Sequence, residues 1–516
     1  MRLFRILGLA LLIGAVPLSA HARGDTAVYA FYTDMRDWDP AIAFSEESWV
    51  LLNVYETLLR YEPNLETGAA RLVPVLAKNW SVSESGLVWR FELREGINFH
   101  DGTAFNASAA KQSLDRTIRI GQGGAYIWDG VTEIRAVSEY VLEIETSRPM
   151  PIDLIASAQY AAYIYSPKSA EQGTNWFNKG NGAGTGPYTI RRWRRGQDVV
   201  LDRFEDYWQG WREGQFRRAI VKVVREAVTQ TQMLRAGDAD FISNASVEVT
   251  ATALTGDESL VVSLSPSWIN KQFLINTSRY PTDNLNFRRA LMHAWDYDSI
   301  VEGVYLGGAT RSKGLIPATM WGHDPDFVGA EFDLAKASEF LSASGVPDAD
   351  RKITIRYVAG QPDFHSAALN FQRNLSTIGI EATLEPGPWG QIWSKARNQS
   401  SASHMISMTW WPTYPTPGDW LKGLFYTEKR PLFNLSFYAN PKFDALVDEG
   451  FAQEGSDRRL AMNAFRAAQE ILVEDAVAIF YADLMNRRIH RADVEYPAAN
   501  PAYNAIFFYD AVRLSP

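Results

Sequence analysis

Residues 93–103 have the sequence LREGINFHDGT, and they follow a run in which apolar and polar side chains alternate. Such alternation predicts a half-buried strand that leads into this segment. Gly96 and Gly102 stand where tight turns need a positive φ, so we expect the chain to turn twice after the strand. The neighbouring His100 and Asp101 could suggest a metal or acid–base site. No further histidine or carboxylate stands at the spacing that would place two metal ligands on one face of a helix, so we expect a turn hydrogen bond instead.

The rest of the chain mixes strand and helix patterns. Residues 140–145 alternate in the manner of a second strand. Apolar residues recur at helical spacing over 364–378, Gly379 follows as a stop signal, and 380–384 resembles the next strand. Another amphipathic helix is predicted over 460–472. This mixture indicates an α/β protein with more than one lobe.

Composition excludes several classes of protein. The 516 residues are 46% apolar, which allows about three compact units and a sizeable core. The formal net charge is −9, and an acidic chain argues against general nucleic-acid binding. The sequence has no cysteine, which excludes disulfides, thiolate metal sites and cysteine nucleophiles.

The N-terminus predicts export. Arg2 and Arg5 precede an apolar run over 6–16, and small residues follow up to Ala22. This pattern is typical of a signal peptide, so we expect residues 1–22 to be removed by cleavage after Ala22. The apolar run is too short to span a bilayer, and lipid anchoring would need a cysteine. We therefore predict a soluble periplasmic protein that is not embedded in a membrane.

Six segments, in order along the chain, carry a resemblance to a known family. They are Asp39-Pro40 with Val54–Leu59, Leu72–Ser83, Leu93–Thr103, Gly184–Tyr188 with Tyr207-Trp208, Asn276-Thr277 with Asn286–Leu291, and Trp410–Leu421. On these segments the chain resembles the periplasmic solute-binding proteins of ABC importers, in the oligopeptide/dipeptide/nickel-binding family (solute-binding protein family 5). The resemblance covers nearly the whole chain after residue 22.

The resemblance implies an α/β, two-lobed periplasmic-binding-protein fold with a hinge and an extra subdomain inserted in the first lobe. Lobe I would comprise 23–62, 187–275 and 482–516, with the inserted subdomain over 63–186, and lobe II would comprise 276–481. Such proteins hold a ligand in the cleft between the lobes and close around it by hinge bending. The closed form docks on the importer's permease subunits, which work with their ATPases. The resemblance therefore implies a monomeric binding protein rather than an enzyme, with no cofactor and no metal.

The same resemblance bears on the ligand. In peptide-binding members, an Asp of the Trp410–Leu421 segment pairs with the peptide's ammonium group, and Thr413 occupies that position here. A hydroxyl cannot neutralise a buried ammonium. Some members hold the peptide carboxylate with an Arg six residues earlier, where this chain has Ser407, although Arg397 lies nearby. Neither anchor of a free peptide is thus carried over directly.

Aromatic side chains supply the other candidate contacts, because flat rings stack on sugars, apolar side chains or cations. Trp410 and Trp411 are adjacent on an expected strand, so the two should face opposite sides. We expect about half of the candidate tryptophans to be core residues. The predicted ligand-binding residues are Trp38, Phe44, Tyr126, Trp128, Trp389, Trp393, Arg397, Trp410, Trp411, Thr413 and Tyr414.

Several functions stay open at this point. The leading hypothesis is import of a peptide or peptide-like solute, with an oligosaccharide or opine-like ligand as the alternative of the same class. Nickel is disfavoured because only six histidines would remain after cleavage and none clusters. A secreted glycoside hydrolase would need two carboxylates roughly 5–10 Å apart, for which Asp419 and Glu385 are candidates. A structural periplasmic protein or chaperone would show no ligand-induced closure.

Overall fold

The computed structural model describes residues 25–44, 46–63, 70–243, 245, 249–250, 256–359, 361–495, 500–503 and 513–514. The predicted signal peptide lies outside the described residues. Within these ranges, no helix has the length and hydropathy needed to cross a membrane.

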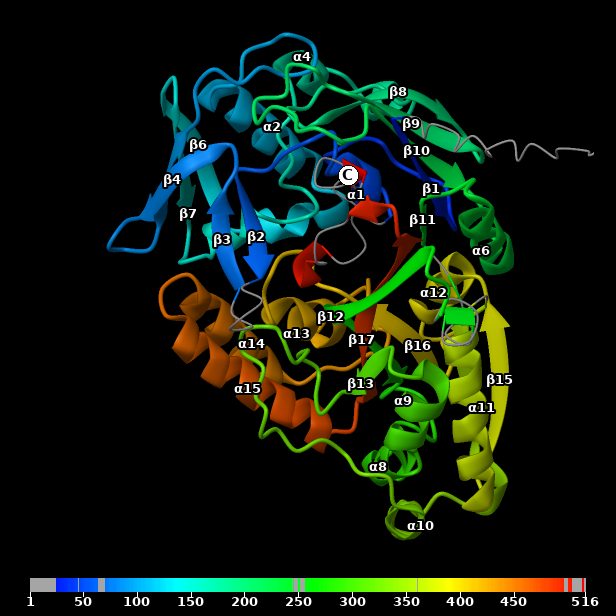
Figure 1. The fold of residues 1–516 in the computed structure, drawn as a ribbon. Coiled ribbons are helices and arrows are strands. Elements are labelled where there is room, and N and C mark those ends of the chain that lie inside the picture. The colour runs from blue at the N-terminus through cyan, green and yellow to red at the C-terminus, as the bar shows by residue number, and fades with distance from the viewer. Residues whose placement is uncertain are drawn as a thin grey trace, which may run out of the picture.

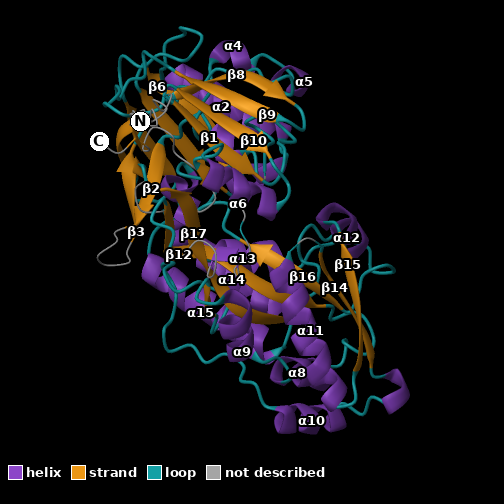
Figure 2. Cartoon of the chain, turned by 45° about the vertical axis from the view of Figure 1, so that its right-hand side comes forward, coloured by secondary structure: helices purple, strands orange, loops and turns teal. Residues whose placement is uncertain are grey.

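One eleven-stranded sheet extends through the whole molecule, in the order β15-β14-β16-β12-β17-β11-β1-β10-β9-β8, with β13 paired to β17. Two long antiparallel strands, β12 (Leu260–Ile275) and β17 (Ala478–Arg491), lie in its middle. Figures 1 and 2 show these strands joining an upper and a lower body. We call the body around β1 lobe I and the body around β14 lobe II. The residue boundaries given above for the lobes stay predictions.

The pairing of the two long strands is irregular where they pass between the lobes. The register between β12 and β17 shifts between Pro266 and Asn270, and again between Lys271 and Gln272. A shift of register interrupts the ladder of hydrogen bonds and bends the strand. The two strands can therefore bend at these irregular positions when the lobes move relative to each other.

Lobe I has its part of the large sheet and two smaller sheets. Parallel pairing of β1 with β10 and antiparallel pairing of β10 with β9 form its central layer. A four-stranded sheet in the order β4-β5-β7-β6 and the β2–β3 hairpin lie to one side (Figure 1). The strands of lobe I are β1 (Thr26–Phe31), β2 (Leu59–Pro63), β3 (Ala70–Pro74), β4 (Ala77–Val82), β5 (Val88–Leu93), β6 (Val131–Ser138), β7 (Val141–Thr146), β8 (Tyr188–Arg194), β9 (Asp198–Arg203), β10 (Arg218–Val223) and β11 (Phe241–Ile242). Its helices are α1 (Ser48–Leu51), α2 (Ala107–Ile120), the 3₁₀ helix η1 (Gly123–Trp128), α3 (Ile152–Ile155), α4 (Pro167–Ala170), α5 (Thr174–Phe177) and α6 (Ala227–Ala236).

Lobe II contains most of the helices. β14 pairs in parallel with both β15 and β16, and α11 connects β14 to β15. Its strands are β13 (Ala309–Arg311), β14 (Lys352–Val358), β15 (Glu381–Gly387) and β16 (Met405–Trp410). Its helices are α8 (Leu285–His293), α9 (Tyr297–Tyr305), α10 (Leu334–Ala343), the 3₁₀ helix η3 (Asp348–Asp350), α11 (Pro362–Thr377), α12 (Trp389–Ala396), α13 (Gly418–Phe425), α14 (Pro441–Glu454) and α15 (Arg458–Glu474).

The local predictions are confirmed. The alternating runs form β5 and β7, and the two helical patterns form α11 and α15. In the segment 93–103, Gly96 and Gly102 have φ values of 74° and 77°. The Thr103 amide donates to the Asp101 carboxylate at 3.0 Å, which is the expected turn hydrogen bond.

The glycines of the Gly184–Tyr188 segment allow two chain segments to cross closely. A Cβ atom on Gly184 would lie 1.9 Å from the Val54 carbonyl oxygen, and one on Gly186 would lie 2.8 Å from the Asn53 carbonyl oxygen. No side chain fits at such distances, so the crossing requires glycine. This contact fixes the start of β8 against the segment after α1.

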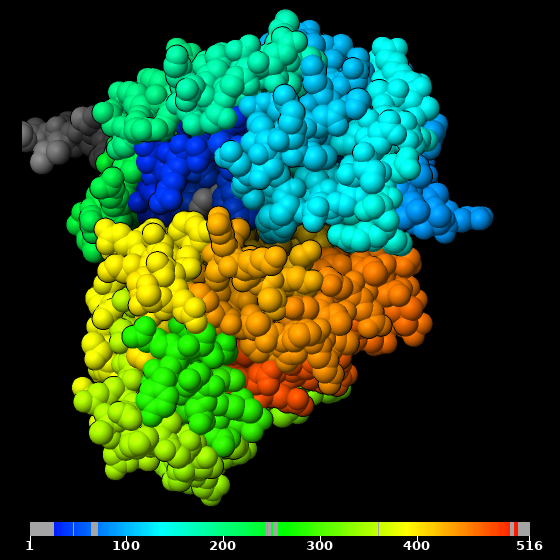
Figure 3. Space-filling view, turned by 180° about the vertical axis from the view of Figure 1, so that it is seen from behind, coloured from blue at the N-terminus to red at the C-terminus, as the bar shows by residue number. Residues whose placement is uncertain are grey.

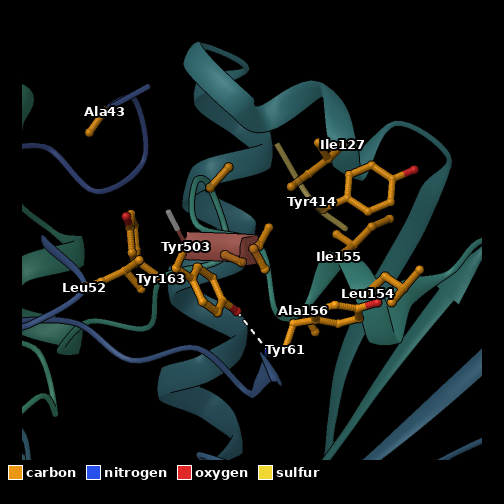
Figure 4. Close-up of a cluster of buried hydrophobic side chains, with 14 of the residues drawn as sticks. Ala43, Leu52, Tyr61, Ile127, Leu154, Ile155, Ala156, Tyr163, Tyr414 and Tyr503 are labelled. Carbon is orange, nitrogen blue, oxygen red and sulfur yellow. Dashed lines mark hydrogen bonds between the residues drawn. The ribbon is translucent and has the colours of Figure 1, made fainter. Parts of the chain in front are cut away.

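The C-terminal part of the chain returns to lobe I. Tyr503, in the 3₁₀ helix η4 (Pro501–Tyr503), accepts a hydrogen bond from the Tyr61 amide at 3.0 Å and donates one to the Ser157 carbonyl at 2.7 Å. Figure 4 shows Tyr503 within a cluster of buried side chains that includes Tyr61, Tyr163 and residues of α3. The short strands β18 (Val494–Glu495) and β19 (Arg513–Leu514) pair with each other in antiparallel orientation. Long-range packing of this kind completes lobe I only after the chain has passed through lobe II.

Candidate functional site

Lobes I and II contact each other directly through side chains. The Tyr126 hydroxyl of η1 lies 2.6 Å from the Thr413 hydroxyl, and it donates to the Asp419 carboxylate at 3.0 Å. Asp419 also accepts the Thr413 amide at 3.1 Å. Burial raises the pKa of Asp419 to about 6, although these hydrogen bonds favour the charged form. Tyr126 therefore forms a polar bridge from lobe I to lobe II.

A second bridge lies beside the first. The Trp411 indole, directly after β16, donates to the Tyr160 hydroxyl of lobe I at 3.2 Å. The Gln159 amide donates to the Pro412 carbonyl at 2.9 Å. Figure 3 shows the seam along which the two lobes meet. Because these contacts join the lobes, they would break if the molecule opened at its hinge.

Three aromatic residues at or beside this junction are partly exposed. The exposed fraction is 42% for Tyr126, 37% for Trp411 and 38% for Tyr32. Burial raises the pKa of the Tyr126 and Tyr32 hydroxyls well above the ordinary value for tyrosine. A neighbouring carboxylate raises the pKa further, and it belongs to Asp419 for Tyr126 and to Glu46 for Tyr32. The hydroxyls are thus hydrogen-bonded within the protein, while each residue as a whole keeps a part that is exposed to solvent. This combination is typical of rings that face a recess between two parts of a protein.

Other side chains of lobe I pack beside these aromatic residues. The Phe44 ring packs edge-on against Tyr160, with centroids 5.0 Å apart, and against Tyr126 at 6.2 Å. The Tyr32 hydroxyl donates to the Glu46 carboxylate at 2.9 Å. The junction therefore offers partly exposed aromatic residues beside hydroxyl groups and carboxylates. Such a surface can pack on apolar parts of a ligand and hydrogen-bond its polar parts.

The structure brings together only part of the predicted set. Phe44, Tyr126, Trp411 and Thr413 lie at the junction. Trp410 is 7% exposed and packs edge-on against Phe433, so it faces away from Trp411 as expected for adjacent strand residues.

Two predicted residues lie in the core of lobe I. The exposed fraction is 0% for Trp38 and 2% for Trp128. The Trp38 ring packs against Trp193, and the Trp128 indole donates to the Ala161 carbonyl at 2.8 Å. A fully enclosed ring has no free face for a ligand, so we leave both residues out of the proposed site.

Three predicted residues lie together on another part of lobe II. Trp389 and Trp393 belong to α12, and Arg397 follows it. The Trp393 indole donates to the Leu432 carbonyl at 2.9 Å. The Arg397 guanidinium lies over the Trp393 ring and donates to the Pro431 carbonyl at 2.6 Å. Arg397 is therefore held against the loop before Leu432 rather than at the Tyr126–Thr413 bridge.

Sequence reasoning missed Tyr160, Gln159 and Tyr32. Tyr160 and Gln159 lie in a run of small and aromatic residues that has the appearance of core. Nothing local to this run indicates that lobe II lies against it.

The carboxylates proposed for a glycoside hydrolase have structural partners. Glu385, on β15, forms an ion pair with Arg356 at 2.7 Å. Asp419 accepts hydrogen bonds from Tyr126 and the Thr413 amide, as described above. No group of three or more metal-ligating side chains is found in the part of the chain that the structure describes.

A buried carboxyl group close to the junction gives a testable pH dependence. Glu454, at the end of α14, is 1% exposed, and Tyr414 donates to one of its oxygens at 3.3 Å. Among the described residues, its other oxygen meets no donor at hydrogen-bond geometry. Burial raises the pKa of Glu454 to about 8. The folded state thus keeps a proton that the unfolded chain releases near its ordinary pKa of about 4.3.

We expect this proton to make wild-type stability fall as pH rises. Between about pH 4.3 and 8 the unfolded state binds fewer protons, so the free energy of unfolding declines by at most about 1.4 kcal/mol per pH unit. Glu454→Gln should remove this part of the slope. Urea denaturation at several pH values measures it, with Glu449→Gln on the exposed side of the same helix as the control. Parallel pH profiles for wild type and Glu454→Gln would show that Glu454 is ionised in the folded protein.

Comparison with known proteins adds independent information. Residues 71–431 match the bacterial extracellular solute-binding proteins, family 5 middle. The chain is 27% identical to the probable D,D-dipeptide-binding periplasmic protein DdpA of Escherichia coli strain K12, over 98% of each chain. It is 26% identical to the glutathione-binding protein GsiB of Salmonella typhi, over 91% of this chain and 90% of the relative.

A solved structure has the same fold. The ABC transporter-associated periplasmic binding protein DppA from Helicobacter pylori, in complex with the peptide STSA, matches with a TM-score of 0.79. The match covers 96% of this chain and 98% of that one, at 23% sequence identity. The predicted α/β periplasmic-binding-protein fold is therefore confirmed.

Proposed function

The chain belongs to family 5 of the bacterial extracellular solute-binding proteins, and we propose that it captures a peptide or peptide-like solute for the permease of an ABC importer. Proteins of this family are substrate-binding proteins of ABC importers and have no catalytic activity. The periplasm is the proposed compartment, because the relative from Escherichia coli is periplasmic by name. The proposed working form is a monomer that delivers its ligand to the permease subunits and their ATPases.

The observation that carries this proposal is the set of partly exposed aromatic residues at the junction of the lobes. Tyr126 and Trp411 come from different lobes, and each is bonded to the opposite lobe through its polar atom. A ligand between them would contact both lobes at once, so its binding would favour the closed state. The proposed ligand-binding residues are Tyr32, Phe44, Tyr126, Tyr160, Trp411 and Thr413.

Peptide chemistry suits this surface. Aromatic faces pack on apolar side chains, and hydroxyl groups can donate to peptide carbonyls or accept from peptide amides. The relatives named for a D,D-dipeptide and for glutathione, and the structural neighbour with a bound peptide, support a peptide-type ligand. An oligosaccharide or opine-like ligand is the second candidate, favoured by the neutral Thr413 in the place of a charged anchor.

Thr413→Asp should increase the affinity for peptides with a free amino terminus. The new carboxylate would lie beside the Tyr126 hydroxyl and Asp419, so a bound ammonium would relieve the repulsion between two buried acids. Calorimetric titration with dipeptides and tripeptides measures the change, and Thr413→Asn is the uncharged control. N-acetylated peptides should gain nothing. Equal heats for Thr413→Asp and Thr413→Asn would exclude an ammonium site at this position.

Thermal-shift screening of the wild type tests the class of ligand. Peptide pools are expected to raise the melting temperature, because a ligand that binds only the folded state stabilises it. Sugars and opine-like compounds serve as the comparison. Stabilisation by these compounds alone would replace the peptide proposal with the second candidate.

A further inference from the structure

A pocket of about 630 Å³ opens on lobe II, away from the Tyr126–Thr413 bridge. Its walls are the end of α12, represented by Arg397 and Asn398, and the segment that follows α13, represented by Lys429, Arg430 and Tyr438. All lining residues fall between 278 and 439, so none comes from lobe I. Figure 3 shows this face of lobe II, where the yellow and light-orange segments adjoin below the seam. Because one lobe builds the pocket, hinge closure leaves its shape unchanged.

The charge of this pocket is positive although the chain as a whole is acidic. Arg397, Lys429 and Arg430 contribute three cations, and Glu428 contributes the one carboxylate in the lining. Lys429 and Arg430 are exposed, and neither has an ion-pair partner among the residues that the structure describes. Glu428 accepts the Leu432 amide at 2.7 Å and its charge also attracts Arg397, so the excess of positive charge in the pocket lies on Lys429 and Arg430. Asp444, behind the loop, similarly accepts the Thr427 amide at 3.1 Å.

The walls of the pocket are held rigidly. Arg397 is fixed by its hydrogen bond to Pro431 and by the Trp393 ring, whose centroid lies 4.5 Å from the guanidinium carbon. Asn434, 2% exposed, donates to the Tyr426 and Tyr438 carbonyls at 2.9 and 2.8 Å. Such a network sets the position of the loop before any partner arrives. Lys429 and Arg430 are exposed on this frame.

We propose that this pocket is a docking site for an acidic segment of a partner protein. Exposed cations at the opening of a wide pocket can meet several carboxylates along a peptide, whereas a small anion is usually enclosed by converging donors. The neighbouring Leu432 is 38% exposed and offers an apolar contact to the same segment. The partner can engage lobe II before and after the solute binds. This role is separate from solute capture, because no residue of the pocket belongs to the proposed ligand-binding set.

The test uses a fluorescently labelled oligoglutamate peptide and the mature full-length protein. Fluorescence anisotropy should show binding to the wild type that weakens with added salt. The double variant Lys429→Glu/Arg430→Glu should lose affinity by about tenfold or more, because charges that attract are replaced by charges that repel. The control Lys222→Glu/Arg225→Glu makes the same change of net charge at exposed positions of lobe I, and it should stay within about twofold of wild type.

The proposal would be overturned by absence of binding to the wild type, by equal affinity in the pocket variant, or by equal losses in the pocket and control variants. Displacement by phosphate beyond that by chloride at the same ionic strength would assign the pocket to a small anion instead, and would also overturn it. The thermal shift caused by solute ligands should be the same in the pocket variant and in the wild type. Such a result would show that failure of the docking proposal leaves the proposed transport function intact.

Discussion

Replacing Arg116 with methionine is expected to lower the free energy of unfolding by about 3–5 kcal/mol. Arg116, on α2, donates to both carboxylate oxygens of Asp39 at 2.6 Å. The side chains of the pair are 4% and 0% exposed. Thr174 and the Ala41 amide also donate to Asp39, but neither carries a charge. Without Arg116 a buried carboxylate would remain with no counter-charge. Urea denaturation of the purified protein measures the loss.

An exposed pair on the same helix gives the matched control. Lys111 and Asp115 lie 2.7 Å apart on α2, with side chains 40% and 45% exposed. Because solvent screens such a pair, Lys111→Met should change stability by less than about 1 kcal/mol. If Arg116→Met is as stable as Lys111→Met, the Arg116–Asp39 pair does not hold α2 against the segment before α1.

Trp411→Ala is expected to weaken binding of the solute by about 1–3 kcal/mol, which corresponds to roughly 5–150-fold in affinity. The ring is 37% exposed at the junction, so truncation removes a contact face without opening a cavity in the core. It also removes the hydrogen bond to the Tyr160 hydroxyl that links the lobes. Calorimetric titration with a peptide found in the thermal-shift screen measures the loss, and stability should change little.

Trp411→Phe separates the two contributions. Phenylalanine keeps an aromatic face but cannot donate to Tyr160, so an intermediate affinity would assign part of the effect to each. Wild-type affinity in Trp411→Ala would place the ring outside the ligand contact and would remove it from the proposed site.

Local patterns in the sequence predicted local structure well. The alternation before Leu93 and the helical spacing up to Gly379 specify β5 and α11, because each element buries one face and exposes the other. The glycines of the segment 93–103 adopt the positive φ that their turns require. Here the physical cause lies within a few residues of the observed feature, so a single sequence contains it.

The candidate site could be predicted only in part, because its contacts join distant residues. Tyr126 and Thr413 are 287 positions apart, and Trp411 and Tyr160 are 251 positions apart. Trp38 and Trp411 are the same type of residue, yet Trp38 is buried in lobe I and Trp411 is partly exposed at the junction. What distinguishes them is the packing of whole lobes, which no local pattern records.

The resemblance supplied the architecture but not the ligand contacts. Six short segments in the right order led to the two-lobed fold, and the match over residues 71–431 confirms the family. The position that the resemblance assigns to the ammonium-binding Asp holds Thr413, whose hydroxyl lies against Tyr126, and the Asp419 carboxylate accepts hydrogen bonds from the Tyr126 hydroxyl and the Thr413 amide. A change of one residue at such a position alters which group of the ligand can be neutralised. The ligand must therefore be found by experiment.

Affinity selection with mass spectrometry identifies the class of solute that the protein binds. The purified protein is stripped of bound molecules by unfolding and refolding, incubated with a mixture of peptides, sugars and opine-like compounds, and separated from unbound material. We expect the wild type to enrich peptides and Trp411→Ala to lose this enrichment. Enrichment of non-peptide compounds alone, or equal retention of peptides by wild type and Trp411→Ala, would contradict capture of a peptide at the junction of the lobes.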